Sequence, residues 1–249
     1  MMNPSPERVA LVTGGSRGIG QAISKRLALD GFNIIVNYFS REDAARETCE
    51  SIEKMGGKAW PCQADVTQRA DVQRLFAAIR EKHKVLNVLV NNAGRVHEAL
   101  FALTPPDQFW QVMQANLMGT LLCSQAALRM MLPQRQGVII NMSSTAVFRA
   151  PVGLSAYAAA KAAVNSVTRT LAREVVSKGI RVNAVAPSWT ATEMLKDSNQ
   201  SAIRAGVQHL PLGRLNTPDE IASAVSALVR DDMTGLVGQI LVLDGGGTV

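Results

Sequence analysis

The chain has 249 residues, of which 47% are hydrophobic, so it is long enough to bury one substantial core. No Pro/Gly/Ser-rich or single-charge stretch divides it, and we expect one domain over residues 1–249. No apolar run approaches the roughly 18 residues of a membrane span, and residues 1–8 lack a signal-peptide layout. A cytoplasmic protein without a membrane segment is therefore predicted.

The net charge of +6 favours an acidic partner, but Lys and Arg are spread along the chain. Aromatic residues make up only 4%, which argues against a nucleic-acid surface built on base stacking. The three cysteines and three histidines have no pair spacing, so neither disulfides nor a metal site are predicted. A phosphate-bearing cofactor or an acidic carrier protein fits the charge better.

An apolar run at residues 9–12 leads into a glycine-rich loop and then a helical pattern. Glycines let a loop approach a pyrophosphate at a helix N-terminus, where unpaired N–H groups favour negative charge. The spacing at 14–20 is G-x-x-x-G-x-G, which differs from the commoner G-x-G-x-x-G. The loop predicts a dinucleotide site, and the alternative is a tight turn without a ligand.

The second expected strand, 33–39, contains Asn37 and Tyr38 at its end. In dinucleotide-binding folds an acidic residue here binds the adenosine ribose of NAD, and its carboxylate would repel a 2′-phosphate. This chain has no acid at that point, and Arg17 in the glycine loop and Arg41 supply positive charge. The pattern favours NADPH, unless Arg41 merely begins the next solvated helix.

The remaining apolar runs alternate with helical patterns, which implies crossover connections and a parallel sheet with helices on both faces. Ligands of such sheets bind outside the carboxyl ends of the strands, and an insertion at about 189–212 is expected to cover that site as a lid. Strands are predicted at 58–66, 85–90, 137–143, 180–186 and 239–243, and helices at 42–55, 69–82, 109–131 and 155–176.

Tyr157 and Lys161 are four residues apart on an expected helix, so they share a face. A phenol ionises near pH ~10, and an adjacent ammonium lowers its pKa, which suits acid/base chemistry. Ser144, at a strand end, can hydrogen-bond a substrate carbonyl beside that phenol. Alone, a Y-x-x-x-K pair also occurs on solvated helix faces. Asn116, inside an apolar helical run, is either functional or a capping or bend residue.

The combined motifs resemble those of short-chain dehydrogenases/reductases over essentially the whole chain. The resemblance implies a Rossmann-type, doubly wound sheet of seven parallel strands, and a catalytic tetrad of Asn116, Ser144, Tyr157 and Lys161. The family's interval to the tyrosine selects Ser144 over the adjacent Ser143. The motifs, in that family's order and spacing, are T-G-G-S-R-G-I-G at 13–20, N-N-A-G at 91–94, Asn116, Ser144 and Y-A-A-A-K at 157–161.

The resemblance also implies roles for these side chains. Tyr157 would donate a proton to the developing alkoxide, and Ser144 would hydrogen-bond the same oxygen. Lys161 would hold the nicotinamide ribose and lower the pKa of Tyr157, while Asn116 would anchor a water that links Lys161 to solvent. The residues expected to contact NADPH are Gly14, Ser16, Arg17, Gly18, Ile19, Asn37, Tyr38, Asp65, Val66, Asn92, Ala93, Gly94, Tyr157, Lys161, Pro187, Thr190 and Thr192.

Within the family, the chain is most similar to reductases that act on 3-oxoacyl groups on acyl carrier protein. That likeness implies NADPH-dependent reduction of a 3-oxoacyl thioester in fatty-acid, polyketide or polyene-type biosynthesis, by a homotetramer. Arg135 and Lys178 stand where these reductases carry basic residues that meet the carrier, although both also suit an ordinary surface. The likeness rests on V-N-Y at 36–38, A-R-E-V at 172–175, V-N-A-V-A-P at 182–187 and P-L-G-R at 211–214.

Some features depart from that pattern and leave the substrate open. Ser188 follows Pro187 where the family usually has glycine, and residues 95–103 differ from the usual reductase loop. Free small alcohols or ketones, such as sugars, steroids or quinones, are an alternative substrate class. A non-catalytic nucleotide-binding subunit is disfavoured by the intact tetrad. An apolar substrate wall is expected from Phe148, Pro151, Val152, Leu154, Trp189 and Met194.

Overall fold

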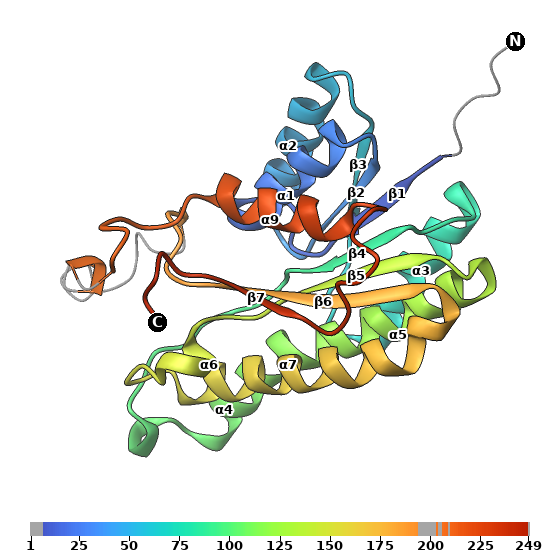
Figure 1. Ribbon diagram of the computed structural model, residues 1–249. Helices are drawn as coiled ribbons and strands as arrows, with labels where there is room; N and C mark the ends of the chain where they lie inside the picture. Colours follow the sequence, from blue (N-terminus) through green and yellow to red (C-terminus); the bar gives the residue numbers. More distant parts are fainter. Residues whose placement is uncertain (1–6, 194–202, 204–205, 209, 249) are drawn as a thin grey trace, which may run out of the picture.

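The computed structural model describes residues 7–193, 203, 206–208 and 210–248, and its strands form one parallel sheet (Figure 1). The sheet has seven strands in the order β3-β2-β1-β4-β5-β6-β7, which confirms the predicted doubly wound architecture. The strands are β1 Val9–Val12, β2 Asn33–Tyr38, β3 Ala59–Gln63, β4 Val88–Asn91, β5 Gly137–Met142, β6 Ile180–Pro187 and β7 Ile240–Leu243.

Helices cover both faces of the sheet, with α1, α2 and α9 on one side and α3, α5 and α7 on the other (Figure 1). The chain winds outward from β1 through β2 to β3, and then returns to β4 on the other side of β1. The strand order therefore reverses between β1 and β4, where ligands of such sheets bind. The longer helices are α1 Gly18–Leu29, α2 Glu42–Lys54, α3 Arg69–His83, α4 Pro106–Met113, α5 Gly119–Gln134, α7 Ser155–Val175 and α9 Pro218–Val229.

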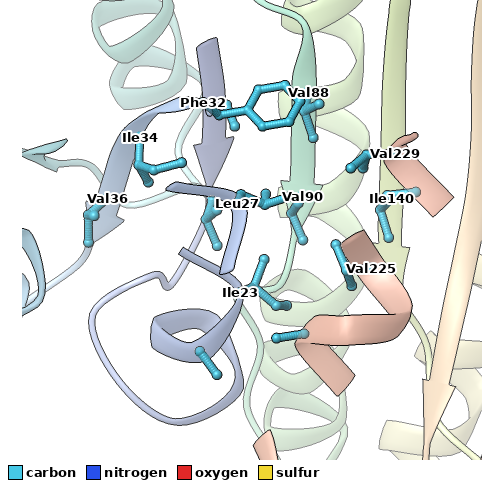
Figure 2. Packing of buried hydrophobic residues seen from close by; sticks show 14 of the residues in the cluster. Ile23, Leu27, Phe32, Ile34, Val36, Val88, Val90, Ile140, Val225 and Val229 are labelled. Atoms are coloured by element: carbon cyan, nitrogen blue, oxygen red, sulfur yellow. The ribbon is translucent and has the colours of Figure 1, made fainter. Parts of the chain in front are cut away.

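The core has two layers because both faces of the sheet are buried. In β1, Ala10 and Val12 belong to one hydrophobic cluster, while Val9 and Leu11 belong to the other. Figure 2 shows part of the first, in which side chains of α1 and α9 lie over β4 and β5. Alternate side chains thus pack on opposite sides, and the strands read as continuous apolar runs.

A buried polar network ties the central strands to α5 and α7. Asn91 of β4 and Asn141 of β5 lie opposite each other, and the Asn91 Nδ2 donates to Asn141 Oδ1 at 2.8 Å and to Ser124 Oγ at 3.0 Å. The Asn141 Nδ2 then donates to Thr168 Oγ1 at 2.8 Å. Hydrogen bonds between buried side chains fix a register that apolar packing leaves free to slide.

Two local features differ from the sequence-based expectation. The single helix predicted at 109–131 is interrupted, because Gln114–Met118 form a π-helical turn between α4 and α5. The helix α9 was not predicted, although Thr217 and Glu220 form a capping box around Pro218 at its first turn. Half of the predicted lid at 189–212 lies outside the described residues, namely 194–202, 204–205 and 209.

Candidate active site

A cavity of about 1030 Å³ opens where the strands end at their carboxyl edge. It is lined by the glycine loop, the ends of β2, β4, β5 and β6, and the first turns of α7. Every residue predicted to be catalytic or to contact the cofactor lines it. A volume of this size can hold a ligand larger than an ordinary drug-sized molecule.

The glycine loop adopts a shape that side chains would prevent. Gly14 and Gly18 have φ of +59° and +54°, in the left-handed region. A Cβ on Gly20 would lie 2.1 Å from the Gly14 carbonyl oxygen, so the first turn of α1 packs directly on the loop. The Asn92 Nδ2 donates to the carbonyls of Thr13 and Gly14, both at 3.0 Å, and so joins the loop to the end of β4.

The loop fits the pyrophosphate of a dinucleotide. The residue before α1, Arg17, provides no side-chain cap, and the first turn contains no acidic residue. The N–H groups of that turn therefore have no capping side chain. Together with the helix dipole they create a positive potential that favours an anion.

The end of β2 serves both structure and charge. Asn37 is buried, its Nδ2 donates to the carbonyls of Cys62 and Ala64 at 3.2 and 3.1 Å, and its Oδ1 accepts from Gly14 N at 3.3 Å. Its amide thus braces the loop against β3. The cavity wall beyond it carries Arg17 and Arg41, as the sequence predicted.

Lys161 is a buried part of the cavity wall, with 4% of its surface exposed. Its Nζ donates to the Met142 carbonyl at 2.7 Å, at the end of β5. Burial lowers the pKa of Lys161 to about 8, because an ammonium is costly to hold away from water. The lysine joins α7 to β5 and carries a charge that the surroundings barely compensate.

Tyr157 and Ser144 meet at the cavity. Burial raises the pKa of the Tyr157 phenol, and its hydrogen bond with Ser144 opposes the rise. The expected lowering by Lys161 is not seen here, because the ammonium is bonded to Met142 and lies 5.6 Å from the centre of the phenol ring. Ser143, the neighbour of Ser144, is buried and also lines the cavity.

Asn116 occupies the π-helical turn, a local form that often marks functional sites. Its Nδ2 donates to the carbonyls of Arg95 and Val112 at 2.7 and 2.9 Å, while its buried Oδ1 has no partner among the described residues. A Cβ on Gly94 would lie 2.4 Å from that Oδ1 and 3.7 Å from Lys161 Nζ. Glycine at 94 thus lets the amide oxygen and the ammonium share one small space.

Comparisons with known proteins agree with this geometry. A family model described as enoyl-(acyl carrier protein) reductase matches residues 14–248. A 3-oxoacyl-[acyl-carrier-protein] reductase of Synechocystis is 38% identical over 96% of this chain and 96% of its own length. The corresponding reductases of Staphylococcus epidermidis and Staphylococcus aureus are each 35% identical, over 95% of this chain and 97% and 96% of their own lengths.

The chain belongs to the short-chain dehydrogenase/reductase family. It is therefore an oxidoreductase of a family that uses a nicotinamide cofactor. Within the described part of the chain, no helix is long and apolar enough to cross a membrane. Nor do His, Cys, Asp and Glu side chains gather there in a group that could hold a metal ion.

The substrate side of this short-chain dehydrogenase/reductase agrees only in part with the predicted apolar wall. Val152, Leu154 and Trp189 line the cavity, as does Pro151, whereas Phe148 points elsewhere and is 49% exposed. Met194 lies outside the described residues. A Cβ on Gly206 would lie 1.6 Å from the Trp189 ring, so glycine there lets the chain pass directly over the indole.

Sequence reasoning missed several polar residues of this wall. They give weak signals in a sequence, because isolated charges in loops are common and only the fold brings these segments together. Arg149 lies five residues after Ser144, at the end of the short helix Ala146–Arg149. The missed residues are Arg95, Glu98, Gln111, Gln114, Arg149 and Glu193.

The two predicted docking cations lie near the amino ends of the strands, whereas the cavity lies at the carboxyl ends. Arg135 ends α5 just before β5 begins, and Lys178 stands just before β6. Both are exposed, and the Arg135 Nη2 donates to the Ser177 carbonyl at 3.2 Å. The two residues are therefore close to each other, and the length of the strands separates them from the cavity of their own subunit.

The buried ammonium predicts a pH-dependent stability difference between the wild type and Lys161→Met. Unfolded lysine titrates near pH ~10.4. The folded value is about 8, so between these values the unfolded chain binds more protons. The free energy of unfolding of the wild type should rise relative to the variant by about 2 kcal/mol from pH 7 to pH 9.5, measured by urea unfolding. A pH-independent difference would show that Lys161 is not desolvated.

Proposed function

We propose that this protein reduces a 3-oxoacyl thioester attached to acyl carrier protein to the 3-hydroxyacyl product, with NADPH as the reductant. The observation that carries the proposal is the meeting of Ser144 and Tyr157 at the cavity, with Lys161 buried behind them and the glycine loop in the same cavity. The names of relatives that span nearly the whole chain support the substrate class.

When bound, the cofactor supplies the hydride, and the chain supplies proton transfer and orientation. Tyr157 donates its phenolic proton to the oxygen of the carbonyl that is being reduced. The Ser144 hydroxyl hydrogen-bonds the same oxygen and stabilises its developing negative charge. Lys161 holds the ribose next to the nicotinamide, and the free Oδ1 of Asn116 anchors a water through which the lysine exchanges protons with solvent.

A 3-oxoacyl substrate fits the hydroxyl pair better than an enoyl substrate does. In a ketone, the oxygen is bonded to the carbon that receives the hydride, so both hydroxyls can act on the reacting centre itself. In an enoyl thioester, the carbon that receives the hydride bears no oxygen. The relatives' names point the same way, although the family model carries the enoyl description.

The charge at the adenosine end favours NADPH over NADH. Arg17 and Arg41 line that end together with Ser40, and the Arg41 guanidinium pairs with the exposed Asp43 at 3.4 Å. No carboxylate stands at the end of β2 to repel a 2′-phosphate. Guanidinium groups bind phosphate with paired hydrogen bonds.

Docking of the carrier requires a second subunit if Arg135 and Lys178 take part. Exposed apolar or small side chains lie along α5 and α7, including Leu132 and Ala162, and Met118 is exposed just before α5. Two copies packed through these helices in antiparallel order would bring the Arg135 end of one beside the cavity end of the other. We infer a homotetramer of this kind, working in the cytoplasm on fatty-acid or related biosynthesis.

The first test measures NADPH oxidation with a 3-oxoacyl thioester, an enoyl thioester and a free ketone. We expect turnover of the 3-oxoacyl thioester alone, and a loss of about 10²-fold or more in Tyr157→Phe, because the proton donor is removed while NADPH binding is retained. Arg80→Gln, on the exposed side of α3, is the control. Preference for the enoyl thioester or the free ketone would replace the proposal.

Coenzyme choice tests the adenosine end. Arg17→Gln should raise KM for NADPH by about tenfold or more, since a charge-assisted pair with the 2′-phosphate is lost, and leave KM for NADH nearly unchanged. Initial rates with both coenzymes provide the measurement, with Arg80→Gln on the exposed side of α3 as control. Equal effects on both coenzymes would place Arg17 at the pyrophosphate instead.

Carrier recognition predicts that charge reversal affects only one form of the substrate. Arg135→Glu should raise KM for the thioester on carrier protein by about tenfold through like-charge repulsion, and leave the small-thiol thioester unaffected. Steady-state kinetics at low salt with both substrates make the comparison. If both substrates respond alike, the substitution acts through the fold, and if neither responds, the carrier docks elsewhere.

A further inference from the structure

An arginine with no assigned role stands at the substrate side of the cavity. The short helix α6, Ala146–Arg149, directly follows Ser144, and Arg149 at its end lines the cavity. The helix is firmly placed, because the Arg149 N–H donates to the Thr145 carbonyl at 3.0 Å and Thr145 N donates to the Pro187 carbonyl at 3.0 Å. Thr145 itself is buried. The guanidinium therefore extends from a rigid element.

The Arg149 side chain is exposed and lines the cavity. Among the described residues none of the ion pairs includes it, although the carboxylates of Glu98 and Glu193 line the same cavity. A Cβ on Gly247 would lie 3.2 Å from Arg149 Nη1, so the glycine-rich end of the chain passes beside the guanidinium without a side chain to cover it.

The charges of the cofactor and of the substrate decide which of their groups the Arg149 guanidinium can bind. The phosphates of the cofactor belong to the opposite part of the cavity, with the glycine loop, Arg17 and Arg41. Arg149 instead shares its segment with the apolar residues Pro151 and Val152, which line the substrate side. A 3-oxoacyl thioester has an apolar chain, neutral amides, and one charged group, the phosphate of its phosphopantetheine arm.

We propose that Arg149 binds the phosphate of the phosphopantetheine arm of the substrate. The proposal rests on the proposed function, since it takes the substrate to be such a thioester. A guanidinium suits this group because its planar donors match two phosphate oxygens at once. Carrier protein and coenzyme A both supply the same arm, so either can be the source of the phosphate.

The test compares 3-oxoacyl groups on pantetheine, which lacks the phosphate, and on phosphopantetheine. In the wild type we expect kcat/KM to be about tenfold higher with phosphopantetheine, equivalent to about 1.4 kcal/mol. In Arg149→Met this ratio should fall to near one, while Arg80→Met, on the exposed side of α3, should retain it. A ratio near one in the wild type, or a full ratio in Arg149→Met, overturns the proposal.

Three further experiments separate the possible outcomes. Calorimetric binding of phosphopantetheine alone reports the subsite without turnover, so binding that is lost in Arg149→Met supports the subsite even if the reductase activity is absent. Arg149→Lys keeps the charge and should retain part of the ratio, whereas a structural role would lower the melting temperature in every Arg149 variant and leave the ratio intact. Coenzyme A and carrier-protein thioesters, compared in the wild type, identify the source of the arm.

Discussion

The hydrogen bond from the Lys161 ammonium to the Met142 carbonyl is the contact on which the site depends. It crosses from α7 to the last residue of β5, and it holds a charge where burial disfavours one. The register of α7 on β5 is fixed further along both elements by the bond between Asn141 and Thr168. A shift of the helix would separate the lysine from its carbonyl and Tyr157 from Ser144 together.

The second constraint is the close approach of backbones where the strand order reverses. Gly20 packs on the Gly14 carbonyl, and the Asn92 side chain joins the glycine loop to the end of β4. Gly94 then admits the oxygen of Asn116 beside Lys161. The glycine loop and the predicted acid/base residues are thus parts of one packed unit, in which small residues set the distances between larger ones.

Much of this could be predicted from the sequence, because it depends on local patterns. Apolar runs, glycine spacing and the Tyr157–Lys161 interval indicated the sheet, the loop and the catalytic helix. The π-helical turn at Asn116 was not predicted, and the bond of its amide to the Arg95 carbonyl joins residues that are 21 positions apart in the chain. The resemblance to carrier-dependent reductases implied that Arg135 meets the carrier protein. Only the fold shows that Arg135 lies near the amino ends of the strands, away from the cavity of its own subunit.

The raised pKa of Tyr157 bears on the protonation state of the phenol in the free site. A proton donor must be protonated before the reaction starts, and a phenol whose pKa is raised is fully protonated near neutral pH. Donation becomes favourable only when the hydride has made the substrate oxygen an alkoxide, a much stronger base than phenolate. For oxidation the same phenol would have to lose its proton first, which burial opposes. In the ligand-free structure the phenol is therefore held in the protonated form, which is the form that a proton donor needs.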